Sequence, residues 1–299
     1  MSTIKNVTIV GAAGNLGTTV FKKLVDSGRF AIQVLRRTDS TTKYPAGTKV
    51  IDVDFSSVDD LAAALNGQDA VIALFGATSL GLQRELIDAS IRSGVKRFIP
   101  SEFGSDLDNA KNRSLLPFLE KVKIQEYLAE KTQSSSLTYT YIYTGAFLDW
   151  GIEHNFLLDV SKYQPTLFDG GDPVFNATSL DTIANGVVGV LTHPEETKNR
   201  AVYLGDVKVS QNDLLAIAKK VAPNKPWEPK HTTLDEAVGA ADKRLAQGVV
   251  DFQTIVPYLY RAILDPEHGG NFQKNDNELL GVPRKDEKFI EQVYAKALA

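Results

Sequence analysis

Three glycines near the start of the sequence are spaced as a phosphate-binding turn requires. Gly11, Gly14 and Gly17 follow the apolar run 4–10 and open a helical pattern over 15–26. In such a turn the first glycine permits a tight bend, the second lets the backbone approach a pyrophosphate, and the third allows the helix to pack closely on the strand. The free N–H groups of the helix N-terminus also favour an anion. The spacing therefore predicts a dinucleotide site made of Gly11, Ala13, Gly14, Asn15, Leu16 and Gly17.

Basic side chains follow the second apolar run, 30–35. Arg36 and Arg37 stand where NAD-binding proteins commonly carry a carboxylate for the ribose 2′-hydroxyl, and Lys43 lies a little further on. The planar guanidinium group donates several hydrogen bonds and suits a phosphate. These residues therefore predict NADPH as the cofactor rather than NADH. The alternative is that both arginines are simply solvated in a surface loop.

Other kinds of chemistry have little support in the sequence. It contains no cysteine, which excludes disulfides, thiolate catalysis and cysteine metal sites. It has no Gly-x-Ser-x-Gly motif, and its four histidines are far apart, so neither a hydrolase nor a metal site is expected. The net charge of −4 gives no general attraction to nucleic acid. No apolar run approaches the ~20 residues that span a bilayer, and no secretion signal is evident, so we expect a cytoplasmic protein.

The first half of the chain alternates short apolar runs with helical patterns. This alternation is typical of βαβ units and predicts an α/β fold, a Rossmann-like doubly wound parallel sheet. The predicted strands are 4–10, 30–35, 49–53, 69–75, 95–100 and 137–143. The predicted helices between them are 15–26, 58–67, 82–93 and 115–131.

The pattern becomes less regular after Gly145. We therefore predict an NADP-binding Rossmann domain over 1–150 and a smaller C-terminal substrate-binding region over 151–299, with about 174–207 able to pack back on the first domain. Helical spacing in this second half covers 180–191, 211–221 and 288–297.

Three segments carry a resemblance to a known family. Residues 95–106 contain Arg-Phe-Ile-Pro-Ser-Glu-Phe-Gly-Ser-Asp, 118–124 read Phe-Leu-Glu-Lys-Val-Lys-Ile, and 137–142 read Leu-Thr-Tyr-Thr-Tyr-Ile. They resemble the NmrA-like and isoflavone reductase-like branch of the atypical short-chain dehydrogenases, which includes phenylcoumaran benzylic ether reductase and pinoresinol–lariciresinol reductase. The resemblance covers most of the chain and is strongest over 4–150. Residues 145–151 look more like fungal members than plant ones.

The resemblance implies roles for particular residues. It implies NADPH at the glycine turn, with Arg37, assisted by Arg36 and Lys43, on the 2′-phosphate. It places Phe75 and Gly76 near the cofactor ribose, Pro100, Ser101 and Phe103 beside the nicotinamide, and makes Lys121 the catalytic lysine. Phe147, Trp150 and His154 are candidates for a substrate pocket, which Phe156 could share.

The same helix offers a competing catalytic pair. Tyr127 and Lys131 form a literal Tyr-x-x-x-Lys, the pair used by ordinary short-chain dehydrogenases, and Ser101 could be its serine. On an ideal helix Lys121 and Lys131 point about 80° apart, so one nicotinamide cannot easily meet both arrangements. If Lys121 is the working residue, it should point into the cofactor cleft, with Tyr127 and Lys131 remote from it.

Together these features predict an NADPH-dependent reductase of a small aromatic or phenolic secondary metabolite. We expect a monomer or a homodimer. The alternative is a non-catalytic member that binds the dinucleotide and regulates a protein partner; such members tend to lack the lysine, so Lys121 favours an enzyme.

Overall fold

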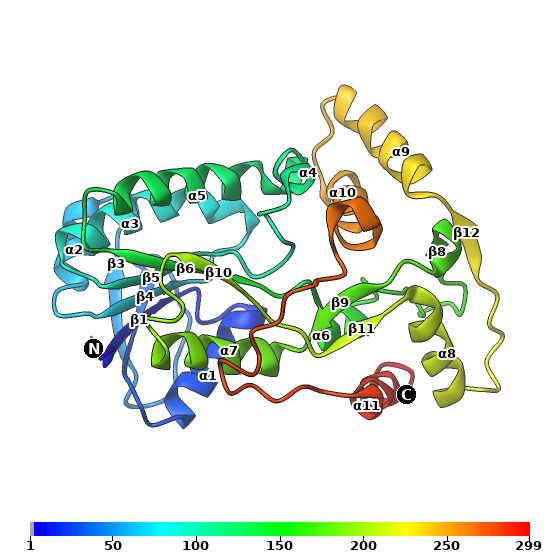
Figure 1. The fold of residues 1–299 in the computed structure, drawn as a ribbon, viewed down its shortest axis with the longest axis horizontal. Coiled ribbons are helices and arrows are strands. Elements are labelled where there is room, and N and C mark those ends of the chain that lie inside the picture. Colours follow the sequence, from blue (N-terminus) through cyan, green and yellow to red (C-terminus); the bar gives the residue numbers. More distant parts are fainter. Residues whose placement is uncertain (1–2) are drawn as a thin grey trace.

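A parallel sheet of seven strands forms the centre of the protein in the computed structural model, which describes residues 3–299 (Figure 1). Met1 and Ser2, at the start of the predicted cofactor domain, lie outside the described residues. The strand order is β10-β6-β5-β4-β1-β2-β3, and every neighbouring pair is parallel. The strands are β1 (Asn6–Val10), β2 (Ala31–Arg37), β3 (Lys49–Val53), β4 (Ala70–Ala73), β5 (Arg97–Ile99), β6 (Thr138–Tyr143) and β10 (Arg200–Tyr203).

Helices cover both faces of this sheet. One face carries α2 (Val58–Ala64), α3 (Gln83–Arg92) and α5 (Leu119–Thr132), and the other carries α1 (Asn15–Asp26) and α7 (Leu180–Thr192) (Figure 1). Each face has its own apolar core, and β1, β4 and β5 contribute to both because their side chains alternate between the faces. The predicted doubly wound parallel sheet is therefore confirmed.

The helix predicted over 115–131 is wrong at its start. A short 3-10 helix, η2 (Leu116–Phe118), precedes α5, which begins at Leu119. Pro117 has no N–H and can occupy only the opening turn of a helix, so the chain turns at η2 before α5 propagates. A 3-10 helix, η1 (Ala77–Leu82), likewise precedes α3.

The second half builds two small sheets and most of the remaining helices. One sheet joins β7 (Ala146–Phe147), β9 (Phe175–Thr178) and β11 (Val207–Val209), and the other joins β8 (Thr166–Phe168) and β12 (Lys230–Thr232). The other helices are α4 (Ala110–Arg113), α6 (Leu148–Glu153), α8 (Gln211–Val221), α9 (Leu234–Ala246), α10 (Phe252–Leu264), α11 (Glu287–Ala297), η3 (Asp169–Gly171) and η4 (Pro266–His268). The sequence did not predict α9 or α10, and α10 contains Pro257 in its interior, which normally disfavours a helix.

The chain returns to the large sheet after residue 150. β10 pairs with β6, and α7 packs against α1. The buried Arg97 side chain of β5 fixes this return, since its guanidinium donates hydrogen bonds to Thr140 Oγ1 at 2.8 Å and Thr197 Oγ1 at 2.9 Å. Burial lowers the pKa of Arg97 to about 10. The domain division at residue 150 stays a prediction.

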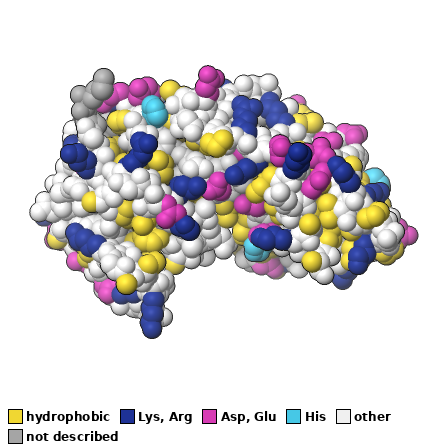
Figure 2. Space-filling view, turned by 90° about the horizontal axis from the view of Figure 1, so that it is seen from below, with side chains coloured by type: hydrophobic (Ala, Val, Ile, Leu, Met, Phe, Trp, Pro, Cys, Tyr) yellow, Lys and Arg dark blue, Asp and Glu magenta, His cyan; other side chains and the backbone are white. Residues whose placement is uncertain are grey.

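Acidic and basic side chains are interspersed on one face of the molecule (Figure 2). On the face drawn in Figure 2, Lys and Arg side chains alternate with Asp and Glu and form no continuous basic stripe. This mixture agrees with the small net charge of −4. Among residues 3–299, no helix combines the length and apolar character needed to cross a membrane.

Candidate functional site

A cavity of about 670 Å³ opens at the carboxyl ends of β1, β4 and β5. The strand order reverses between β4 and β1, and ligands of open α/β sheets bind at such a switch point. Eleven of the residues expected at the site line this cavity: Gly14, Asn15, Leu16, Gly17, Phe75, Gly76, Ser101, Phe103, Lys121, Phe147 and Trp150. The fold thus brings together side chains from five separate parts of the sequence.

The glycine turn joins β1 to α1 and has little room for side chains. Gly11 has a φ of +79°, and a Cβ there would lie 2.1 Å from the Leu74 carbonyl oxygen. A Cβ on Gly17 would lie 2.0 Å from the Gly11 carbonyl oxygen. Both glycines are therefore needed for the turn itself.

Gly14 differs from the other two glycines. It has a negative φ of −73°, and a Cβ there would meet only the Gly11 carbonyl oxygen, at an ordinary 3.5 Å. Gly14 is the N-cap of α1, no side chain caps this end, and the first turn carries no acidic residue. Its N–H groups and partial positive charge therefore face the cavity without a side-chain competitor, as an anion site requires.

The basic residues after β2 lie outside the lining of the cavity and differ in their surroundings. Arg36 is engaged by Asp52 on β3, with Nε and Nη2 donating to the carboxylate at 2.6 and 2.9 Å. Arg37 is two-thirds exposed and lies 3.4 Å from the equally exposed Asp39, and Lys43 is exposed. Arg37 is thus the more exposed of the two arginines, and its only ion pair with residues 3–299 is with the exposed Asp39.

Ser101 links the ends of two strands at the floor of the cavity. Its Oγ donates to the Ala73 carbonyl and accepts from the Phe75 N–H, both at 2.9 Å. Pro100, just before it, is buried and does not line the cavity, whereas Gly76 and Phe103 do. The hydroxyl hydrogen of Ser101 is already donated, so this serine holds the loops after β4 and β5 in register.

Lys121 comes from the first turn of α5 and lines the cavity together with Ser101. Its side chain is half-buried, and its Nζ forms no hydrogen bond or ion pair with residues 3–299. Burial lowers the pKa of the Lys121 ammonium, and the nearby charge of Glu102 opposes that shift. A lowered pKa makes a lysine a better proton donor than an ordinary exposed one.

Tyr127 and Lys131, the competing pair on α5, lie away from the cavity. The Tyr127 hydroxyl donates to the two oxygens of Asp88 on α3, at 2.7 and 2.8 Å, and the Lys131 ammonium lies over the Tyr127 ring. Neither residue lines the cavity. Burial, followed by the effect of Asp88, raises the pKa of Tyr127 to about 12, which opposes its use as an acid or base near neutral pH.

Aromatic side chains from the start of the second half form one wall of the cavity. Phe147 and Phe156 both pack on Trp150, and all three line the space. His154 does not line it, because its ring stacks behind Trp150 with centroids 4.6 Å apart and its Nδ1 lies 2.9 Å from the Trp150 carbonyl oxygen. His154 therefore supports the wall instead of facing a ligand.

The sequence interpretation missed the opposite wall. Ile255, Leu259 and Ile263 of α10 line the cavity, and α10 packs against η2. Their spacing of four residues is a helical signal, but Pro257 between them concealed it. The lining is completed by other missed residues: Leu74, Ala77, Leu80, Gly104, Ser105, Pro117, Phe118, Gly145 and Ala146.

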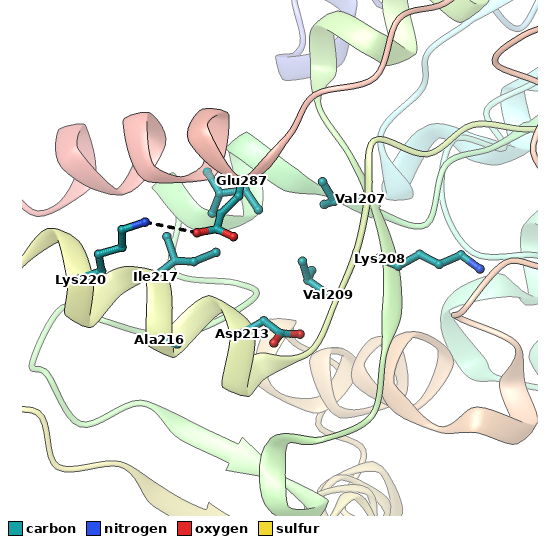
Figure 3. A pocket seen from close by; sticks show the side chains of 9 residues that line it. Val207, Lys208, Val209, Asp213, Ala216, Ile217, Lys220 and Glu287 are labelled. Carbon is teal, nitrogen blue, oxygen red and sulfur yellow. Dashed lines mark hydrogen bonds and ion pairs between the residues drawn. The ribbon is translucent and has the colours of Figure 1, made fainter.

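A second hollow, of about 510 Å³, lies between β11, α8 and α11 (Figure 3). Its floor is aliphatic, and at its rim Lys220 pairs with Glu287 and Glu291, while Asp213 accepts a hydrogen bond from the N–H of Ser210, the N-cap of α8. No residue expected from the sequence to bind a ligand lies there. Residues 3–299 contain no group of three or more His, Cys, Asp or Glu side chains that could hold a metal ion.

Comparison with known proteins agrees with the family resemblance of the sequence. The model of the NmrA-like family matches residues 3–232. Oxidoreductase aprR of Aspergillus flavus is 33% identical to this chain, with 99% of each protein covered. This relative is fungal, in agreement with the fungal character of residues 145–151.

Two solved structures share the fold. One reports pinoresinol–lariciresinol and phenylcoumaran benzylic ether reductases, with a TM-score of 0.81, 20% identity and coverage of 98% of this chain and 100% of that chain. The other is leucoanthocyanidin reductase of Vitis vinifera in a binary complex with NADPH, with a TM-score of 0.79, 19% identity and coverage of 97% and 99%. The family match spans well over half the sequence, and the full-length relative is an oxidoreductase. The chain is therefore an oxidoreductase that belongs to the NmrA-like family.

Proposed function

We propose that this oxidoreductase reduces a small aromatic or phenolic metabolite with NADPH, with Lys121 as the proton relay. The observation that carries the proposal is the composition of the 670 Å³ cavity. The open N-terminus of α1, the Lys121 side chain and an aromatic wall all face this one space. Such a combination holds a dinucleotide beside an apolar molecule and offers it one proton donor.

The residues around the glycine turn fit NADPH. The open position at Gly14 leaves room for a pyrophosphate, and the uncapped N–H groups of α1 suit its charge. The exposed Arg37 at the end of β2 suits a 2′-phosphate. The leucoanthocyanidin reductase that shares this fold is a complex with NADPH, which supports the same cofactor here. Bound NADPH supplies a hydride to the substrate.

The far side of the cavity suits a largely apolar, uncharged substrate. Phe147, Trp150 and Phe156 form one wall, and the aliphatic side chains of α10 form the other. Lys121 is the only charged side chain among the lining residues. A carboxylate or phosphate remote from Lys121 would lose its hydration without gaining a partner, whereas an aromatic ring would be well packed. This assigns the substrate contacts mainly to residues beyond 145.

Lys121 can serve the reduction in two ways. Its ammonium can donate a hydrogen bond to the substrate atom on which negative charge develops. The same group can then give that atom a proton and become a neutral amine, which solvent protonates again. Both roles are supported by the position of Lys121 in the lining of the cavity and by an Nζ that forms no hydrogen bond or ion pair with residues 3–299.

The test is turnover with a panel of aromatic enones, quinones and benzylic ethers, followed by the loss of NADPH absorbance. We expect Lys121→Ala to lower turnover by about 10²-fold, with NADPH still bound, because general acid assistance is lost. Tyr127→Phe is the matched control on the same helix and should leave turnover nearly unchanged. The reverse result would assign the chemistry to Tyr127 and Lys131. Tight NADPH binding without turnover of any compound would instead favour a dinucleotide-sensing regulator.

A further inference from the structure

Gln83 is a buried polar residue behind the lining of the cavity, and the proposed reaction gives it no role. It is the first residue of α3 and is 1% exposed. Gln83 does not line the cavity, but its two hydrogen-bond partners, Leu80 and Ser101, do. A buried amide is costly unless its donor and acceptor groups are paired, so its partners indicate what it holds in place.

Two hydrogen bonds fix the orientation of the Gln83 amide. Its Oε1 accepts from the backbone N–H of Ser101 at 2.9 Å, and its Nε2 donates to the Leu80 carbonyl at 3.1 Å. A backbone N–H can only donate and a carbonyl can only accept, so both bonds require the same placement of the oxygen and the nitrogen. The side chain therefore bridges the loop after β5, which contains Ser101, and the 3-10 helix η1, which contains Leu80.

Ser101 and Gln83 together hold both ends of the segment 75–80, which follows β4. At the start of this segment, Ser101 Oγ accepts from the Phe75 N–H and donates to the carbonyl of Ala73, the last residue of β4. At the end of the segment, the Ser101 N–H holds the last residue through the Gln83 amide. The residues of the segment that line the cavity are Phe75, Gly76, Ala77 and Leu80. The shape of this part of the cavity therefore depends on one serine and one glutamine.

The strand order indicates which half of NADPH the segment 75–80 faces. In the order β5-β4-β1-β2, the glycine turn follows β1 and Arg37 ends β2. With the pyrophosphate at the turn and the 2′-phosphate at Arg37, the adenosine half extends from β1 toward β2. The nicotinamide half then extends the other way, over the ends of β4 and β5, where the segment 75–80 and Ser101 lie. A change in the segment should therefore affect the nicotinamide half alone.

We propose that Gln83 is a positioning residue of the cofactor site: its amide keeps the segment 75–80 in the shape that receives the nicotinamide half of NADPH. This role rests on the NADPH-dependent function proposed above. Gln83 touches neither cofactor nor substrate and acts through Ser101 and Leu80. Without its amide, the Ser101 N–H and the Leu80 carbonyl would turn toward water to regain hydrogen bonds, and only a fraction of the molecules would keep the receiving shape.

The decisive experiment compares the affinity for NADPH with the affinity for adenosine 2′,5′-bisphosphate, which lacks the nicotinamide half. Both ligands are titrated into the full-length protein by isothermal titration calorimetry. Gln83→Met keeps the length of the side chain and removes both hydrogen bonds. We expect this variant to bind NADPH about tenfold more weakly, as it would if a tenth of the molecules were competent to bind. Its affinity for the bisphosphate should be unchanged, since that ligand occupies only the β1 and β2 side of the site.

Gln211→Met is the matched control. Gln211 is likewise the first residue of a helix, α8, and is 2% exposed. Its amide accepts from the Phe168 N–H at 2.8 Å and donates to the Leu157 carbonyl at 3.2 Å, and it does not line the cavity. The control should lose stability as Gln83→Met does and keep both affinities. An equal loss of both ligands in Gln83→Met, an unchanged affinity for NADPH, or the same loss in the control would overturn the proposal.

Gln83→Glu gives a second test, which also applies if Gln83→Met does not fold. A protonated carboxyl group can replace the amide, because its C=O accepts from the Ser101 N–H and its O–H donates to the Leu80 carbonyl. The ionised group cannot donate, and burial raises the pKa of such a carboxyl group. We expect the NADP⁺ affinity of this variant to match the wild type at about pH 5.5 and to fall below it by about pH 8.5. The same pH dependence in both proteins would overturn the proposal.

Failure of the reductase function is recognised separately. NADPH binding by the wild type without turnover of any compound would reject that function, whereas a selective loss of NADPH affinity in Gln83→Met would still assign the positioning role. A wild-type protein without affinity for NADPH would overturn both.

Discussion

At the scale of single residues, the three glycines of the turn differ in whether the fold itself requires them. Gly11 and Gly17 approach backbone atoms so closely that any side chain would displace the chain. Gly14 meets only one atom at an ordinary contact distance. The packing of the turn therefore does not by itself require a glycine at position 14, which agrees with the proposed cofactor site at this turn.

Gly14→Val should retain the fold and lose the cofactor. The branched side chain has space in the protein alone but would occupy the approach of a pyrophosphate to α1. We expect a wild-type circular dichroism spectrum and no measurable NADPH binding by fluorescence titration. Gly17→Val is the contrasting variant, expected to unfold at lower temperature. A folded Gly14→Val protein with unchanged affinity would place the cofactor elsewhere.

At the scale of elements, the two arginines after the glycine turn belong to different structures. Arg36 stands opposite Asp52 in the β2–β3 ladder, and their ion pair ties the edge strand β3 to the sheet. Arg37, one residue later, points to solvent beside Asp39. Alternation along a strand thus gives Arg36 a structural partner in β3 and leaves Arg37 exposed, as its proposed role at the 2′-phosphate requires.

Arg37→Ala should therefore remove most of the preference for NADPH over NADH. We expect the preference, tenfold or more in the wild type, to fall by about tenfold, equivalent to about 1.4 kcal/mol. Arg36→Ala should keep more of the preference and weaken the β2–β3 edge by no more than ~1 kcal/mol, since the pair is partly exposed. Titration of both cofactors and urea unfolding measure the two effects. A larger loss of preference in Arg36→Ala would reverse the assignment.

α10 shows how an element remote in the sequence completes the site. Ile255, Leu259 and Ile263 lie on one face of this helix and close the cavity over η2. On another face, Tyr258 donates a hydrogen bond to Asp242 of α9, and α9 packs against α10. This wall of the cavity is therefore carried by a helix pair that lies outside the large sheet.

At the scale of the whole molecule, the buried Glu102 makes stability depend on pH. Its pKa is about 7 in the folded protein against an ordinary value of 4.5. Since the folded state holds this proton more tightly, the stabilisation is fully present below pH 4.5 and is lost as pH rises through 7. The difference corresponds to about 3 kcal/mol.

Comparison of the wild type with Glu102→Gln isolates this contribution. Between pH 5 and pH 8, the free energy of unfolding of the wild type should fall relative to the variant by up to about 3 kcal/mol, because glutamine cannot ionise. Urea unfolding at each pH, followed by circular dichroism, gives the two curves. A constant difference between them would mean that Glu102 is ionised throughout this range.

The sequence by itself determined the elements and much of the site. Apolar periodicity predicted every strand of the large sheet except β10, and α1 was predicted with both of its observed ends. The glycine spacing alone predicted the turn that faces the cavity. These features are local: a strand, a helix or a tight turn is specified by residues close together in the chain.

Only the tertiary structure decided which of the candidate site residues lie together at the cavity. Lys121 and Tyr127 share one helix, and the packing of α3 against α5 directs Tyr127 to Asp88 and leaves Lys121 facing the cavity. The His154 ring stacks behind Trp150, and Arg36 pairs with Asp52. α10 contains Pro257 and is nevertheless helical, because tertiary packing of its apolar face outweighs the local cost of the proline. Such outcomes depend on contacts between residues tens to hundreds of positions apart, which no local pattern encodes.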